Sequence, residues 1–215
     1  MNTVTQIRFV WKPIVFLLCL APLALVLTDL FEITGTLGAN PVEAMLDRFG
    51  IWSIRFTLIA LAVTPLRRLT GWNWLVRFRR MLGLFAFFYV LLHFLVWLLL
   101  DRALWFTPVA EVIPFVIEDI VERTFITIGF VALLILTALA VTSTSGMRRR
   151  MGRSWQKLHN LVYVAGILGI WHYWWQVKTG AGDAIYYAAI LTVLLGLRIY
   201  WQLQKRQLRA QKSPA

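Results

Sequence analysis

Cysteine and charge are what this sequence has least of. Cys19 is the only cysteine, so the chain cannot form an internal disulfide or a thiolate metal cluster. Charged residues make up 15% of the chain and hydrophobic residues 60%. A soluble domain of this size normally carries more charge and fewer apolar side chains. The composition therefore predicts an integral membrane protein, and the length of its apolar segments predicts an all-α fold.

Six apolar segments of about the length that crosses a bilayer follow one another along the chain. They lie at residues 13–31, 51–66, 81–100, 125–142, 158–177 and 184–201. Basic residues precede the first segment as in a signal peptide, but no clean cleavage site follows and Asp29 and Glu32 come too soon, so we expect a retained span. The pattern predicts a six-transmembrane-helix bundle that forms one domain over residues 1–215.

The distribution of charge along the chain predicts its orientation. Sixteen Lys and Arg lie before the first segment, between the second and third, between the fourth and fifth, and after the last. The opposite side has only Arg48, Arg102, Arg123 and Lys178. All ten acidic residues fall on that opposite side or at its span ends: Asp29, Glu32, Glu43, Asp47, Asp101, Glu111, Glu118, Asp119, Glu122 and Asp183. The positive-inside rule therefore predicts cytoplasmic N and C termini.

The net charge of +12 does not indicate a nucleic-acid partner. The basic residues sit between apolar segments, where they determine topology and contact anionic membrane lipid. No G-x-G-x-x-G follows a strand-like run, so we expect no nicotinamide-binding domain. If the chain carries electrons, it must receive them from another molecule. We find no internal repeat in the sequence.

Only three histidines occur, and each lies within an apolar segment. An imidazole in hydrocarbon is costly unless it faces the bundle interior and has a partner or a function. Counted from the nearest cytoplasmic basic residue, His93 and His172 both lie on the order of 20 Å into the membrane at 1.5 Å per residue. His159 lies close to the cytoplasmic surface and about 20 Å from His172 along one helix, so these two cannot ligate the same iron.

The matched depth predicts that His93 and His172 hold a b-type haem between the third and fifth spans. The alternative is that each histidine is a buried polar residue hydrogen-bonded to a carbonyl or hydroxyl group. His159 could ligate a second haem, bind a quinone oxygen or simply lie at the interface. Arg55 could clamp a haem propionate, or it could snorkel to the outer surface. Gly83, Gly166 and Gly169 would admit a flat ring or a close helix contact.

Several segments, taken in order, resemble the MsrQ family of haem-binding membrane subunits, within the broader ferric-reductase-like transmembrane group. These segments are residues 37–43 (LGANPVE), 64–67 (TPLR), 79–84 (RRMLGL), 92–93 (LH), 142–144 (TST), 155–160 (WQKLHN), 162–163 (VY) and 172–173 (HY). Single segments such as TPLR are weak, but the ordered set is specific and runs over essentially the whole chain.

The resemblance implies an electron relay in a bacterial inner membrane. Electrons would come from quinol or a cytoplasmic flavin reductase and pass through haem b to MsrP, a periplasmic molybdopterin reductase that repairs methionine sulfoxide in envelope proteins. It also implies an FMN, whose phosphate Arg77, Arg79 and Arg80 could bind. The histidines that match the family are His93, His159 and His172. The broader group usually has two histidines on the third span, whereas this chain has Arg79 one haem spacing before His93. Both one haem and two haems stay open.

We therefore predict an electron-transfer subunit with no catalytic residue of its own, in which the sulfur chemistry belongs to the partner. The acidic residues 111–122 are a candidate docking surface for that partner. One alternative is a quinol-oxidising cytochrome b anchor for another periplasmic oxidoreductase. The other is a small transporter or scaffold with no redox cofactor, whose histidines relay protons or are structural.

Overall fold

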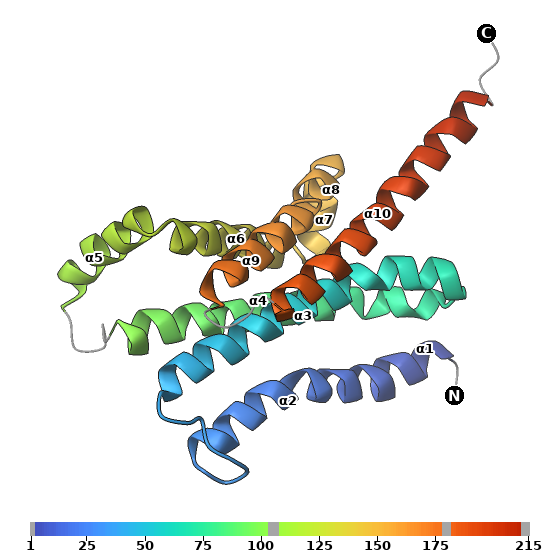
Figure 1. Cartoon of the computed structure of the whole chain (residues 1–215). Helices are drawn as coiled ribbons and strands as arrows, with labels where there is room; N and C mark the ends of the chain where they lie inside the picture. The colour runs from blue at the N-terminus through green and yellow to red at the C-terminus, as the bar shows by residue number, and fades with distance from the viewer. Residues whose placement is uncertain (1–2, 103–107, 178–181, 212–215) are drawn as a thin grey trace.

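The computed structural model describes residues 3–102, 108–177 and 182–211, and these residues form helices joined by short turns (Figure 1). The N-terminal part contains α1 (Thr3–Gln6), η1 (Ile7–Trp11), α2 (Lys12–Leu30), α3 (Pro41–Thr70) and η2 (Asn73–Arg77). The middle part contains α4 (Arg79–Val96), η3 (Trp97–Asp101), α5 (Val109–Glu122) and α6 (Thr124–Val141). The C-terminal part contains α7 (Ser145–Met151), α8 (Arg153–His159), α9 (Val162–Gln176) and α10 (Gly182–Gln211). The predicted all-α fold is confirmed for the described residues.

Five stretches of helix are long and apolar enough to cross a membrane. They are Val4–Leu30, Pro41–Thr70, Arg79–Asp101, Thr124–Val141 and Gly182–Leu208. They correspond to the first, second, third, fourth and sixth of the predicted segments. The largest difference is in α3, which has 30 residues: it begins at Pro41, before the apolar stretch, and Pro65 lies inside the helix instead of ending it. A proline is tolerated in a transmembrane helix when neighbouring groups satisfy the freed carbonyl.

The remaining predicted segment, residues 158–177, is divided in two. Helix α8 ends at His159, a turn follows, and α9 begins at Val162 and has 15 residues. At 1.5 Å per residue α9 is about 22 Å long, which is shorter than a hydrocarbon core of about 30 Å. Its length therefore does not identify α9 as a span, and the count of six spans stays a prediction, as does the cytoplasmic position of both termini.

Local sequence signals fix both ends of α3. The Asn40 side chain accepts a hydrogen bond from the Glu43 N–H at 3.2 Å, and Pro41 occupies the first helical turn. At the other end Gly71 adopts φ +76°, and its N–H donates to the Arg67 carbonyl at 2.9 Å. These caps define a helix about 45 Å long, which is the longest wall of the bundle together with α10.

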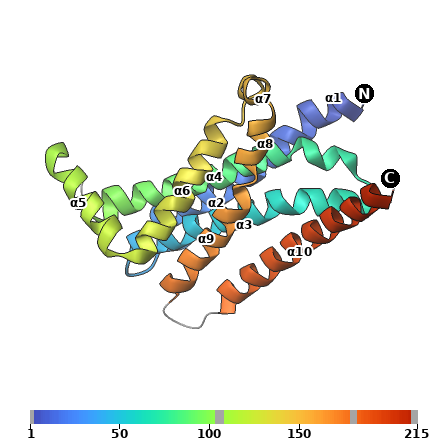
Figure 2. The ribbon, with the colours of Figure 1, turned by 90° about the horizontal axis from the view of Figure 1, so that it is seen from above.

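Helices α3 and α4 form the antiparallel pair at the centre of the bundle (Figures 1 and 2). Helix α2 packs against this pair, α9 and α10 pack against α3, and α6 packs against both α4 and α9. The four helices α3, α4, α6 and α9 therefore meet around a shared interior. The pair α3–α4 contributes His93 from α4, and the pair α6–α9 contributes His172 from α9.

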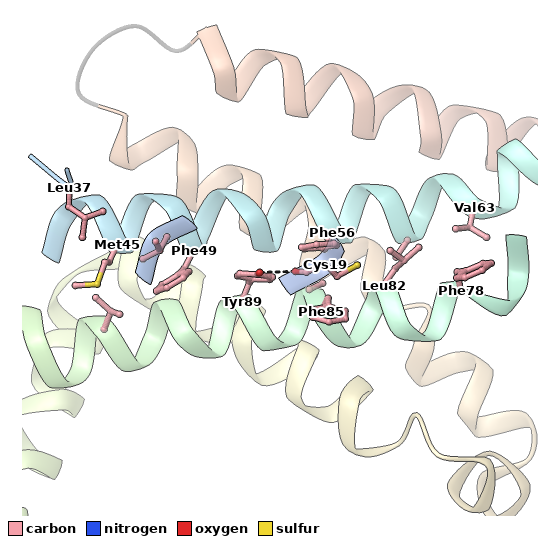
Figure 3. Close-up of a cluster of buried hydrophobic side chains, with 14 of the residues drawn as sticks. Cys19, Leu37, Met45, Phe49, Phe56, Val63, Phe78, Leu82, Phe85 and Tyr89 are labelled. Carbon is pink, nitrogen blue, oxygen red and sulfur yellow. Dashed lines mark hydrogen bonds between the residues drawn. The ribbon is translucent and has the colours of Figure 1, made fainter. Parts of the chain in front are cut away.

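Tyr89 of α4 ties α2 to the central pair (Figure 3). It is completely buried, and its hydroxyl donates to the Cys19 carbonyl at 2.8 Å and accepts from the Leu23 N–H at 3.2 Å. Pro22 lies between these two α2 residues and has no N–H of its own. The Tyr89 hydroxyl thus enters the backbone ladder of α2 beside the proline, which fixes α4 one turn before His93.

Candidate functional site

His93 and His172 lie opposite each other in the bundle interior, with their rings nearly perpendicular. His93 projects from α4 and His172 from α9, and their ring centroids are 6.0 Å apart with the ring planes at 88°. Two imidazoles that ligate one metal place their ring centres roughly 6 Å apart, from metal–nitrogen bonds of ~2 Å and the ~1 Å from each nitrogen to its ring centre. The structure thus brings together the two histidines that matched depth predicted to meet.

Each of these two rings is held by a backbone carbonyl. The Nδ1 atom of His93 bonds to the Leu46 carbonyl at 2.9 Å, and Nδ1 of His172 bonds to the Phe125 carbonyl at 2.7 Å. A carbonyl oxygen can only accept, so Nδ1 carries the proton in both rings and Nε2 presents its lone pair. Metal-ligating histidines are typically oriented in this way by a second-shell acceptor.

Two glycines allow the rings to approach the neighbouring helices. A Cβ on Gly50 would stand 3.1 Å from His93 Nδ1, and a Cβ on Gly129 would stand 2.9 Å from both Nδ1 and Cε1 of His172. A contact below 3.0 Å forces a shift in a ring that is already anchored, so His172 requires glycine at position 129. The Gly50 contact is tight but less severe, and residue composition alone gave no sign of either glycine.

The same local pattern occurs twice, at the same spacing. Leu46 and Phe125 supply the carbonyls, each followed by its glycine after 4 residues (50 − 46 and 129 − 125). In both cases the histidine follows the carbonyl after 47 residues. The α3–α4 and α6–α9 pairs therefore carry one repeated unit, contrary to our expectation of no internal repeat. The unit keeps only three positions, which is too few to stand out in the sequence.

A cavity of about 800 Å³ lies between α3, α4, α6 and α9, and both histidines line it. Its size is within the range of about 300–1,000 Å³ that small-molecule and cofactor sites occupy. Gly166 and Gly169 of α9 line it, as predicted for a surface that admits a flat ring, whereas Gly83 does not. The rest of the wall is mostly apolar and includes Phe94 and Phe130.

Two arginines line the same cavity at the end where α4 finishes and α6 begins. Both form ion pairs with Asp119, at nitrogen–oxygen distances of 2.9 Å for Arg102 and 2.8 Å for Arg123. Asp119 comes from α5, and its side chain is only 8% exposed. This end of the cavity therefore has two guanidinium groups, and the carboxylates of Glu43, Asp47 and Asp101 also line the cavity. The charge pattern of the sequence had indicated only that Arg102 and Arg123 are outer-side charges.

Arg55 does not line the cavity. Its Nε donates to the Tyr187 hydroxyl at 2.8 Å, and its guanidinium lies 4.9 Å from the ring centre of Trp52. Trp52 lies on α3 itself, and Tyr187 lies on α10. The structure therefore gives Arg55 a role in joining α3 to α10, away from the histidine pair.

His159 lies at the other end of the bundle, on α8. Its ring stacks on Trp155 at a centroid distance of 3.8 Å, and its Nδ1 bonds to the Trp155 carbonyl at 3.2 Å. Arg79 at the start of α4 is close enough to repel it electrostatically. Of the three arginines predicted to bind an FMN phosphate, Arg79 is half-buried while Arg77 and Arg80 are exposed. The structure therefore brings His159 and Arg79 together and leaves Arg77 and Arg80 outside this contact.

Comparison with known proteins identifies the family. The family described as ferric reductase like transmembrane component matches residues 49–170. A protein of Ralstonia nicotianae named protein-methionine-sulfoxide reductase heme-binding subunit MsrQ is 54% identical over 78% of this chain and 76% of its own length. Proteins with the same name from Herminiimonas arsenicoxydans and Xanthomonas euvesicatoria pv. vesicatoria are 48% and 44% identical and cover 91% and 94% of this chain. This chain belongs to the MsrQ family.

The MsrQ family and the ferric-reductase-like group are both transmembrane classes, in agreement with the five apolar helices, and the chain is a membrane protein. The matched residues 49–170 run from α3 into α9 and include both glycines that contact the histidine rings. The resemblance found in the sequence is thereby confirmed at the level of the family.

Proposed function

We propose that this MsrQ family member is a haem b subunit that relays electrons across a bacterial inner membrane to a periplasmic methionine sulfoxide reductase. The single observation that carries the proposal is the facing pair His93 and His172, with Nδ1 of each ring bonded to a carbonyl. The names of the relatives, heme-binding subunits of a protein-methionine-sulfoxide reductase, support the same cofactor and system. The proposed partner is the molybdopterin reductase MsrP.

The described residues fit a haem in three respects. The two neutral imidazoles of His93 and His172, with free Nε2 lone pairs, would hold the iron of a haem b. Gly50 and Gly129 leave room for the rings where a Cβ would displace them. The cavity that both histidines line is apolar along its walls and has Arg102 and Arg123 at one end, where they would pair with propionates.

A bound haem b would supply the one-electron carrier, and the chain's own residues set its environment. The Leu46 and Phe125 carbonyls orient the rings and keep Nδ1 protonated, which raises the basicity of Nε2. The apolar wall, including Phe94 and Phe130, excludes water from the metal site. Burial and axial ligand identity are the features through which a protein tunes the potential of such a group.

The donor side is proposed for the opposite end of the bundle, where His159 and Arg79 lie. Quinol, or FMN from a cytoplasmic flavin reductase, would deliver electrons there, with Arg77, Arg79 and Arg80 available for an FMN phosphate. The cytoplasmic position of this donor side requires cytoplasmic termini and six spans, and both are part of the proposal. The acidic residues of α5, between Glu111 and Glu122, would face the periplasm and dock the partner.

A visible difference spectrum of the detergent-purified protein tests the cofactor. Dithionite-reduced minus oxidised protein is expected to show the α-band of a b-type haem, and His93→Ala and His172→Ala are each expected to abolish it. His159→Ala is the matched control and is expected to keep the band, because its ring lies outside the cavity. Full haem content in both His93→Ala and His172→Ala would refute the proposed ligand pair.

The relay itself is tested by electron delivery to the reductase. Membranes that contain the chain and MsrP are expected to reduce a methionine sulfoxide peptide with a quinol or reduced flavin as donor. Omission of the chain, or use of His172→Ala, is expected to stop turnover. A colourless purified protein would favour a transporter or scaffold, and a haem protein that leaves MsrP unreduced would favour an anchor for another periplasmic oxidoreductase.

A further inference from the structure

At the end of the bundle opposite the histidine cavity, Arg198 of α10 has buried nitrogens without a hydrogen-bond acceptor. Its Nε and one terminal nitrogen are buried and, within the described part of the chain, neither has a hydrogen-bond partner. The guanidinium lies 4.8 Å from the ring centre of Tyr163 on α9, which holds it between the two helices. Buried, unpartnered donors are costly unless something outside the chain accepts from them.

Two more arginines converge on the same place. Arg79 at the start of α4 and Arg68 near the end of α3 are both close enough to repel the Arg198 guanidinium. Arg68 is itself held 4.8 Å from the ring centre of Trp201, one turn further along α10. Three positive charges from three helices thus lie within electrostatic range of one another, although mutual repulsion disfavours that arrangement.

The chain supplies no acidic side chain to balance these charges. The acids of α3 and α10 lie near the opposite helix ends, at Glu43, Asp47 and Asp183. Along α3 the distance from Asp47 to Arg68 is about 31 Å, and along α10 the distance from Asp183 to Arg198 is about 22 Å, at 1.5 Å per residue. Among the described residues, no ion pair joins Arg68, Arg79 or Arg198 to an acidic side chain. An anion from outside the protein would balance these charges.

We propose that Arg68, Arg79 and Arg198 form a binding site for one phosphate-bearing anion. A guanidinium presents a planar fork of donors that matches phosphate oxygens, and the partly buried position strengthens the attraction. The aromatic rings of Tyr163 and Trp201 hold two of the forks in place before the anion arrives. The phosphate could belong to an anionic phospholipid, since basic pockets between helices at the cytoplasmic face bind such headgroups, or to a free phosphate ester such as FMN. This site does not depend on the haem.

The test uses the full-length protein, stripped of lipid in detergent and titrated separately with FMN and with a short-chain phosphatidylglycerol. Arg198→Gln is expected to weaken binding of at least one of the two probes by about tenfold or more, as loss of a charge-assisted hydrogen-bonding group does. Arg206→Gln is the matched control, because Arg206 lies exposed on the same helix. It is expected to bind like the wild type. The probe that loses affinity identifies the source of the phosphate.

A folding defect is excluded by requiring that Arg198→Gln keeps the helical circular dichroism of the wild type. If Arg198→Gln loses that helical signal, Arg79→Gln is used in its place. Arg198→Lys keeps the charge but loses the fork, so it is expected to fall between the wild type and Arg198→Gln. The proposal is overturned if neither probe binds the wild-type protein, if Arg198→Gln and Arg79→Gln bind both probes as tightly as the wild type, or if Arg206→Gln weakens binding equally.

Discussion

Gly129 on α6 faces the ring of His172 so closely that a Cβ there would stand 2.9 Å from Nδ1. The ring cannot retreat freely, because its Nδ1 is bonded to the Phe125 carbonyl one turn earlier on the same helix. Gly50 and Leu46 make the corresponding contacts with His93 on the other helix pair. Glycine and carbonyl together position each histidine from the facing helix.

Gly129→Ala is therefore expected to displace His172 and to weaken haem binding about tenfold. Forcing an extra methyl into a packed site costs typically about 1–3 kcal/mol. The measurement is haem per polypeptide after purification, together with the thermal midpoint. Gly83→Ala is the matched control on α4, because a Cβ at Gly83 would meet no atom within 4 Å. Equal haem content in both variants would contradict the proposed role of Gly129.

The histidine pair could be predicted from the sequence because only helix rise and the positive-inside rule were needed to match the depths of His93 and His172. The groups that hold the rings could not be predicted from the sequence. Leu46 and Phe125 act through backbone carbonyls, which every residue has, and Gly50 and Gly129 matter only because of the helix that each one faces.

The helix boundaries show a similar division. Hydropathy placed the apolar centres of the five long stretches, but it missed the polar first turns of α3, which Asn40 caps. It also joined α8 to α9, since the turn that separates them is too short to interrupt an apolar pattern. The contacts of the arginines were equally hidden, because Arg55 bonds to Tyr187 of α10 and Arg102 pairs with Asp119 of α5, and neither partner is close in sequence.

Tyr89→Phe is expected to lower the free energy of unfolding by about 1 kcal/mol, the usual net value of one hydrogen bond. The substitution removes the hydroxyl that joins the Cys19 carbonyl to the Leu23 N–H and so loosens α2 from α4. Haem content should stay unchanged, since Tyr89 does not line the cavity. Thermal unfolding followed by circular dichroism measures the effect. Tyr186→Phe, at a residue 68% exposed, should leave the midpoint unaltered, and an equal loss in both variants would show that the effect is not specific to the buried hydroxyl.

His159→Gln is expected to keep the spectrum of the haem and to slow its reduction by the donor. The ring lies outside the cavity and stacks on Trp155, so it has no part in holding the metal between α4 and α9. Stopped-flow reduction with quinol, and separately with reduced FMN, measures the rate, and a fall of about tenfold corresponds to ~1.4 kcal/mol at the barrier. Unchanged rates with both donors would place electron entry elsewhere, and loss of the spectrum would make His159 an iron ligand.

Arg102→Gln is expected to lower the midpoint potential of the haem. Arg102 lines the cavity and is the partner of both Asp101 and Asp119, so its removal leaves uncompensated negative charge beside the site. Negative charge disfavours the reduced form, which carries one more electron. A unit charge acting through a partly buried site changes such an equilibrium by about 1 kcal/mol, so the shift should be some tens of millivolts, given about 59 mV per tenfold change for one electron.

A redox titration in the visible range measures this shift, and Arg48→Gln is the control. Arg48 lies near the same end of the bundle but pairs with Asp29 and does not line the cavity. Its removal should therefore leave the potential within a few millivolts of the wild type, because exposed charges are screened by salt. A rise in potential on Arg102→Gln, or an equal fall in both variants, would mean that Arg102 does not act on the haem through its charge at the cavity. Arg123→Gln is expected to lower the potential by less than Arg102→Gln does, because the Arg123 side chain is 48% exposed and the Arg102 side chain is 19% exposed.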